Sequence, residues 1–234
     1  MRKISRPPSG AQQVKKRAQT SVQVSWQLNF SGGKPTMAMT EADVLREEVR
    51  NAYSTPARRP EEKHAFPVGR AFAESVSCAA ELLDRLPAIA SDGFAGVSNA
   101  SLYADIPLGA TVLDLGCGAG PDTLIAARRA ASLGKVIALD YGAAMLDRAR
   151  QAVAESGERN VEVREADAEH LLLADGQIDV AIVNGILNLN PSRGTIFREL
   201  ARVISPGGTV FAAELIISSP LPPESRTSEA DWFA

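Results

Sequence analysis

A glycine-rich turn is the part of the sequence best suited to binding a ligand. Val112–Gly120 reads VLDLGCGAG, so Gly116, Gly118 and Gly120 directly follow a short apolar segment. Glycines between a strand and a helix let a ligand approach the backbone, and the helix N-terminus offers unpaired N–H groups. The dinucleotide-binding pattern has its third glycine three residues after the second, whereas here Gly120 follows after two, before Pro121. This spacing disfavours a nicotinamide-dependent oxidoreductase.

Two acids follow later apolar segments. Asp140 closes one of them, where its carboxylate can accept hydrogen bonds from both ribose hydroxyls of a nucleoside lying across the strand ends. Asp167 follows the next and could accept from an adenine amino group, with a backbone amide at Ala168 serving the ring nitrogen. Tyr141 and Met145 could sandwich the adenine. The simpler alternatives are a helix cap for Asp140 and a solvated loop acid for Asp167.

Other polar residues have less specific interpretations. Asp114 can bind loop amides or the amino group of a methionine moiety, or be a turn residue. Asn184 and Asn188 bracket the turn after the predicted fourth strand, where they could orient a substrate or make ordinary turn hydrogen bonds. No acid–base pair is recognisable from spacing, so the catalytic residue is unknown; the candidates by location are His64, His170, Tyr103, Asn184 and Asn188.

From Thr111 onward, strands alternate with helices. We expect strands over 111–115, 135–140, 161–165, 178–184 and 208–217, and helices over 122–132, 143–156 and 193–203. This rhythm predicts an α/β fold with a Rossmann-like, doubly wound, mainly parallel sheet.

Two helices are expected before the sheet. Thr40 and Asp43 suit the start of a helix over 41–53. Apolar residues on one stripe predict a second helix over 72–86. Pro56 and Pro60 are expected to break the chain between the two helices, and residues 87–107 to be irregular.

Composition divides the chain into three parts. We expect a disordered basic leader over 1–38, a helical cap on the substrate side over 39–107, and a ligand-binding core over 108–234. The leader resembles a transit peptide, but an upstream extension before a start at Met37 or Met39 explains it as well.

Charge and cysteine content narrow the function. The net charge is −3, and residues 1–37 carry seven positive and no negative side chains, so the remainder carries about −10. Nucleic acids and anionic membranes attract clustered cations, so an acidic body favours a small-molecule partner. Cys78 and Cys117 have no metal-ligand spacing, so no metal site is expected, and no apolar run is long enough for a membrane span. A cytoplasmic protein fits.

Together these motifs resemble the class I S-adenosylmethionine (SAM) dependent methyltransferases, in the branch related to arsenite methyltransferases. The resemblance runs from about Val49 to the last residue and is most specific in VLDLGCGAGPD at 112–122, VIALD at 136–140, MLDRAR at 145–150, NGILNL at 184–189 and RVISPGG at 202–208. It implies SAM bound along the carboxyl ends of the first four strands. The implied cofactor contacts are Asp114, Leu115, Gly116, Cys117, Gly118 and Gly120 around the methionine portion, Asp140, Tyr141, Met145, Asp167 and Ala168 around the nucleoside, and Asn184 beside the transferable methyl.

The chain departs from that branch in two ways. The resemblance implies arsenic-binding cysteines in the loop containing Val97, at the position of Gly185, and towards the C-terminus, and this chain has none of them. The family also has a further helix and a β-hairpin, for which too few residues follow the fifth strand. We therefore expect either a fragment of a longer protein or an exposed fifth-strand edge that a partner or a second copy covers.

The expected function is methyl transfer from SAM to an unidentified small-molecule acceptor. The alternative is an incomplete or non-catalytic methyltransferase-like module that binds SAM or a partner chain.

Overall fold

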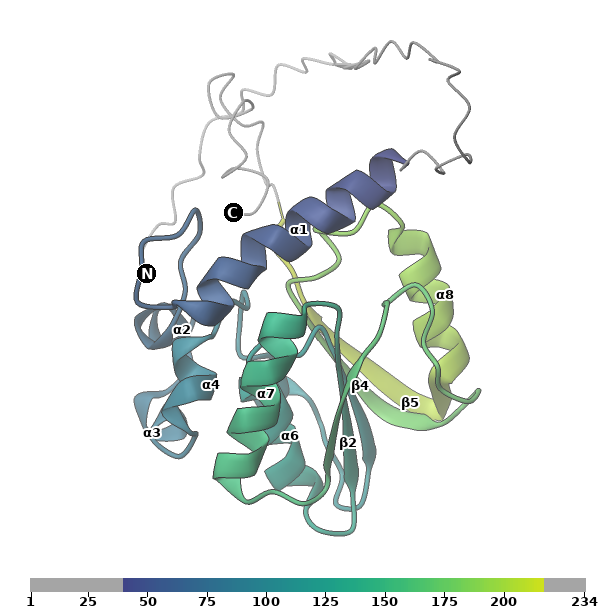
Figure 1. The fold of residues 1–234 in the computed structure, drawn as a ribbon. Helices are drawn as coiled ribbons and strands as arrows, with labels where there is room; N and C mark the ends of the chain where they lie inside the picture. The colour runs from purple at the N-terminus through teal and green to yellow at the C-terminus, as the bar shows by residue number, and fades with distance from the viewer. Residues whose placement is uncertain (1–39, 217–234) are drawn as a thin grey trace, which may run out of the picture. The chain divides into compact units, whose positions relative to one another are not determined.

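The structure is a computed structural model that describes residues 40–216 (Figure 1). The predicted leader and the last residues of the predicted core lie outside the described residues. Within residues 40–216, no helix has both the length and the apolarity that crossing a membrane requires.

Five parallel strands form one sheet in the order β3-β2-β1-β4-β5. The bounds are β1 Thr111–Leu115, β2 Lys135–Asp140, β3 Val161–Glu165, β4 Ile178–Asn184 and β5 Ile204–Ala213. The predicted bounds of the first four strands are confirmed, but those of β5 are wrong. Its pairing with β4 begins at Ile204, slips between Ile178 and Val180, and resumes at Thr209. Gly207, with φ 87°, belongs to the irregular stretch of β5 rather than to a turn before it.

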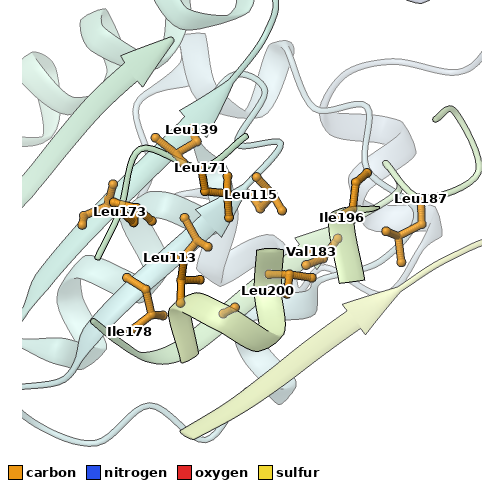
Figure 2. Close-up of a cluster of buried hydrophobic side chains, with 13 residues drawn as sticks. Leu113, Leu115, Leu139, Leu171, Leu173, Ile178, Val183, Leu187, Ile196 and Leu200 are labelled. Atoms are coloured by element: carbon orange, nitrogen blue, oxygen red, sulfur yellow. The ribbon is translucent and has the colours of Figure 1, made fainter. Parts of the chain in front are cut away.

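Helices cover both faces of the sheet, which confirms the doubly wound fold. On one face, α8 (Arg193–Val203) packs its buried Ile196, Leu200 and Val203 against the odd-numbered side chains of β1 and β2 (Figure 2). On the other face, α6 (Pro121–Ala130) and α7 (Ala143–Ser156) cover the even-numbered ones. Since successive side chains of a strand point to opposite faces, each central strand is buried on both sides.

The segment before the sheet differs from the prediction. Its helices are α1 Glu41–Arg58, α2 Arg70–Ser75, α3 Ala80–Leu83, α4 Ala88–Asp92 and α5 Ala100–Tyr103. Helix α1 runs past the expected end because Pro56, lying in its last turns, does not stop it. The predicted helix over 72–86 is divided at Ser77, whose φ of 73° is not helical. The region 87–107, expected to be irregular, contains α4 and α5.

Helix α1 begins where the sequence predicts. The Thr40 hydroxyl accepts a hydrogen bond from the Asp43 N–H at 3.1 Å, and the Asp43 carboxylate accepts one from the Thr40 N–H at 3.0 Å. This reciprocal capping box satisfies two N–H groups at the helix start. Figure 1 shows α1 lying across one end of the sheet.

Leu113 is fully buried in the central strand β1, whereas Leu133 is 88% exposed. We expect Leu113→Ala to lower the free energy of unfolding by about 2 to 5 kcal/mol, because it leaves a cavity between the sheet and α8. Leu133→Ala makes the same chemical change in solvent and should cost less than about 0.5 kcal/mol. Urea unfolding of both variants measures this, and equal losses would contradict the packing.

Candidate functional site

The glycine turn joins β1 to α6 in a conformation that only glycine adopts easily. Gly116 and Gly118 have φ of 79° and 52°, in the left-handed region. A Cβ on Gly116 would lie 2.3 Å from Cγ2 of Ile186, whereas a Cβ on Gly118 would meet nothing within 4 Å. The backbone of Gly116 therefore packs tightly against the Ile186 side chain, whereas open space lies beside Gly118.

Asp140 ties this turn to the end of β2. Its carboxylate accepts hydrogen bonds from the N–H of Gly118 and from that of Gly142, each at 2.8 Å. Burial raises the pKa of Asp140, and the backbone hydrogen bonds from Gly142 and Gly118 oppose that rise. The N-cap residue of α7 is Gly142, and no side chain caps that helix, so Asp140 is not a plain helix cap.

A cavity lies at the carboxyl ends of the strands, between the glycine turn and α1. Its empty volume, including the part open to solvent, is about 1180 Å³. Ten of the twelve predicted cofactor-binding residues line it: Leu115, Gly116, Cys117, Gly118, Asp140, Tyr141, Met145, Asp167, Ala168 and Asn184. The topology thus brings together the ends of β1, β2 and β4 and the loop after β3.

Asp114 and Gly120 lie outside the cavity lining. Asp114 is 1% exposed, and its carboxylate accepts a hydrogen bond from the Thr123 hydroxyl of α6. Burial first, and then the nearby Asp122 carboxylate, raises the pKa of Asp114 to about 8. Gly120 is the N-cap residue of α6. Both residues fix the helix that follows the turn, and their contact with a cofactor stays a prediction.

The residues expected around adenine meet different neighbours. The Arg50 guanidinium of α1 lies 3.9 Å from the centroid of the Tyr141 ring, a cation–π contact on one face of that ring. Met145 is 3% exposed and packs in a cluster with Ala57 and Ala119. A ligand can therefore stack on the Tyr141 face that Arg50 occupies only if Arg50 moves.

Sequence reasoning missed the contribution of α1. Arg46, Val49, Arg50 and Tyr53 line the cavity from one helical face. Their three- and four-residue spacing was the available signal, but in a polar helix that pattern also fits a solvent-exposed surface. Burial first, and then the charges of Asp140 and Glu214, raises the pKa of Tyr53 to about 12. The Tyr53 hydroxyl therefore stays protonated near neutral pH.

Glu214, just beyond β5, was also missed. Its carboxylate accepts hydrogen bonds from three successive backbone N–H groups, those of Ile186 at 3.0 Å, Leu187 at 2.8 Å and Asn188 at 3.4 Å. The turn after β4 is thereby fixed in place. The wrong end predicted for β5 placed Glu214 inside a strand, so its side chain was not considered.

Of the five general-base candidates, Asn184 alone lines the cavity. His64, His170, Tyr103 and Asn188 are absent from its lining. The Nε2 atom of His64 lies 2.8 Å from the Arg59 carbonyl oxygen, and Tyr103 is 66% exposed. Among residues 40–216, no cluster of His, Cys, Asp and Glu side chains has the geometry of a metal site.

An ion pair fastens α1 at the cavity. The Arg46 guanidinium donates to Glu169 Oε1 from Nη2 at 2.5 Å and from Nε at 3.0 Å. Burial alone raises the pKa of Glu169, but hydrogen bonds from Arg46, Ser192 and Asn190 outweigh it and keep the pKa below its ordinary value. Glu169 therefore connects α1 to the loop after β3.

Comparison with known proteins identifies the family. The methyltransferase domain family matches residues 108–232. The chain belongs to this family. An arsenite methyltransferase of Halobacterium salinarum is 38% identical over 127 residues, covering 54% of this chain and 32% of the relative. A demethylmenaquinone methyltransferase of Lactococcus lactis is 34% identical over 106 residues, covering 45% of this chain and 42% of the relative.

A solved structure supports the same assignment. An arsenic(III) S-adenosylmethionine methyltransferase from Chlamydomonas reinhardtii is 26% identical, with a TM-score of 0.53, over 72% of this chain and 57% of that one. The resemblance to class I methyltransferases of the arsenite methyltransferase-like branch is confirmed. The chain spans less than half the length of the two curated relatives above.

The Arg46–Glu169 pair gives a test by pH. A carboxyl whose folded pKa is lowered stabilises the fold above its unfolded pKa, near 4.5, and loses that contribution as the pH falls through the folded value. We expect Glu169→Gln to lower the free energy of unfolding by about 1 to 2 kcal/mol at pH 7, and by less below pH 4.

Glu74→Gln is the matched control, because the Arg70–Glu74 pair is exposed. It should cost less than about 0.5 kcal/mol. Urea unfolding at several pH values measures both variants, and a gap between wild type and Glu169→Gln that does not shrink in acid contradicts the ion pair.

Proposed function

We propose that the protein transfers the methyl group of SAM to a small-molecule acceptor. The observation that carries this is the Asp140 carboxylate, which is fixed between the backbones of Gly118 and Gly142 beside open space in the cavity. The family assignment and the likeness to methyltransferases support the same reaction class.

The residues present fit SAM. Each Asp140 oxygen accepts one backbone hydrogen bond and has further lone-pair capacity, which two ribose hydroxyls can use. The open side of Gly118 admits a ligand against the backbone. Asp167 Oδ1 already accepts from the Glu169 N–H at 2.9 Å, which leaves its other oxygen for an adenine amino group. Carboxylates at the site also suit a ligand that carries a sulfonium and an ammonium group.

Bound SAM supplies an electrophilic methyl group, and the protein contributes orientation and exclusion of water. The backbone of the glycine turn and the Asp140 carboxylate orient the cofactor at one end of the cavity. Val49 and Tyr53 of α1 form the opposite wall, with Ile186 and Leu189 from the turn after β4. The raised pKa of Tyr53 makes its hydroxyl a hydrogen-bond donor rather than a base. We therefore propose that the acceptor provides a nucleophile that needs no base from α1.

The proposed acceptor is not arsenite. A Cβ on Gly185 would lie 3.2 Å from Cγ1 of Val97, so the positions where the resemblance implies two cysteines are neighbours in space. This chain has the isopropyl group of Val97 at one position and only the hydrogen of Gly185 at the other. Trivalent arsenic requires soft thiolate ligands. Cys78 and Cys117 are each 5% exposed and belong to different packing clusters. We expect arsenite with added thiol to give no release of S-adenosylhomocysteine (SAH) above background, and turnover of arsenite would reject this assignment.

The cofactor site is tested by isothermal titration of the full chain with SAM and SAH. Asp140→Asn turns one acceptor oxygen into a donor facing a backbone N–H and removes the charge. We expect it to weaken SAH binding about 100-fold, as the loss of charge-assisted hydrogen bonds implies. Asp147→Asn removes a carboxylate from the exposed face of α7, where the side chain is 78% exposed, and should leave the affinity within threefold. Absence of SAH binding to the wild type would sink the proposed function.

A further inference from the structure

The side-chain amide of Asn184 makes all of its hydrogen bonds to other groups of the protein. Its Oδ1 accepts from the N–H of Val97 at 2.9 Å and of Ser98 at 3.3 Å. Its Nδ2 donates to the Ser98 carbonyl oxygen and to Asp122 Oδ2, each at 2.7 Å. A primary amide has two donor hydrogens and two acceptor lone pairs, so these four contacts leave nothing for a ligand.

Asp122 extends the connection from β4 to α5. Its second oxygen, Oδ1, accepts from the Ser101 N–H at 2.9 Å. Asp122 lies in the first turn of α6 and is 8% exposed. Asn184 and Asp122, together with the backbone of residues 97, 98 and 101, form what we call the amide clamp. It joins three segments that lie far apart in the sequence.

The segment directly before the clamped residues forms one wall of the cavity. Gly93, Phe94, Ala95 and Gly96 line it. A Cβ on Gly93 would lie 2.6 Å from Cβ of Ala119 in the glycine turn. A Cβ on Gly96 would lie 2.6 Å from Asn184 Nδ2. The wall therefore approaches both the turn and the clamp as closely as its glycines allow.

We propose that Asn184 and Asp122 are positioning residues, which hold Val97 and Ser98 and thereby fix residues 93–96 as the wall of the cavity, without contacting cofactor or acceptor through their side chains. The effect of the clamp on ligand binding rests on the proposed function, whereas its effect on the wall does not. From its position at the end of β4 alone, a polar side chain such as that of Asn184 would be expected to contact the cofactor directly. The four internal contacts assign Asn184 a different role.

Exchanging the two partners tests the clamp. Asn184→Asp places a carboxylate oxygen where Nδ2 faces Asp122 and the Ser98 carbonyl, so two donated hydrogen bonds become repulsive contacts. The double variant N184D/D122N restores one of these two hydrogen bonds, between the two side chains with reversed polarity, and leaves the contact with the Ser98 carbonyl oxygen repulsive. If the Asn184 side chain contacted the cofactor directly, the exchange would not recover SAH affinity. A positioning pair recovers part of it.

Amide hydrogen exchange at Val97 and Ser98 and SAH affinity are the two readouts. We expect N184D to accelerate exchange at both amides at least tenfold and to weaken SAH binding at least tenfold. The double variant should recover part of both losses, because the contact with the Ser98 carbonyl oxygen stays unfavourable. Unchanged exchange in N184D, or no recovery in the double variant, overturns the proposal.

Two further variants distinguish a specific effect on the clamp from general destabilisation of the fold. Gly96→Ala presses a methyl group against Asn184 Nδ2 without altering charge, and it should accelerate the same two amides. Asn160→Asp is the matched control, because Asn160 Nδ2 donates to the carbonyl oxygens of Ala127 at 3.0 Å and Ala131 at 2.9 Å, away from the cavity lining. It should lower the melting temperature and leave SAH affinity within threefold, whereas a loss of affinity equal to that of N184D would assign the N184D effect to general destabilisation.

The experiment separates this proposal from the proposed function. If the wild type binds no SAH, the proposed function fails, and exchange at Val97 and Ser98 in the exchanged pair still decides the clamp. If the wild type binds SAH and exchange is insensitive to Asn184, the clamp fails alone.

Discussion

The Asp140 carboxylate, bound by the N–H groups of Gly118 and Gly142, is the contact on which the site depends. It fixes the turn after β1 to the end of β2, and so determines where the backbone of Gly118 faces the open space of the cavity. Burying a carboxylate is unfavourable unless hydrogen bonds satisfy it. The charges of Asp122 and Asp140 add to the effect of burial in raising the pKa of Asp114. Three carboxyl groups therefore gather at this end of the sheet, and burial raises the pKa of two of them, Asp114 and Asp140.

The remaining walls come from segments that carry no glycine-turn motif. Helix α1 is held at one end by Arg46 and Glu169, and near its other end by Arg148, which donates to the Ala57 carbonyl oxygen at 2.9 Å. Glu214 fixes the turn after β4. Each contact joins residues far apart in the sequence, so each closes a loop of the chain at an entropic cost.

The sequence predicted the sheet well and the cap poorly, for physical reasons. Strands β1, β2 and β4 are short, mainly apolar runs, as is typical of buried parallel strands, whereas β3 alternates valine with charged residues, as is typical of a strand at the side of a sheet. The start of α1 was legible because Thr40 and Asp43 cap it locally. Ser77 was not predicted, because it ends α2 in the left-handed conformation that glycine usually adopts there, with its N–H bonded to the Glu74 carbonyl oxygen and that of Cys78 to the Ala73 carbonyl oxygen. The acids and glycines of the site were found because parallel strands bring their carboxyl ends to one edge.

Asn184 shows where such reasoning stops. Its position after β4 places it at the cavity, but its partners at Val97 and Ser98 lie 87 and 86 residues earlier and contribute only backbone atoms. Backbone partners leave no trace in residue identity, so no pattern could assign the amide to them. The same arrangement separates two properties of the site. Backbone hydrogen bonds fix the position of Val97, while the residue types at 97 and 185, where a Cβ on Gly185 would lie 3.2 Å from Cγ1 of Val97, set the chemistry of that contact. Substitution at those two positions can therefore change this contact while the hydrogen bonds of the clamp and the glycine turn stay as they are.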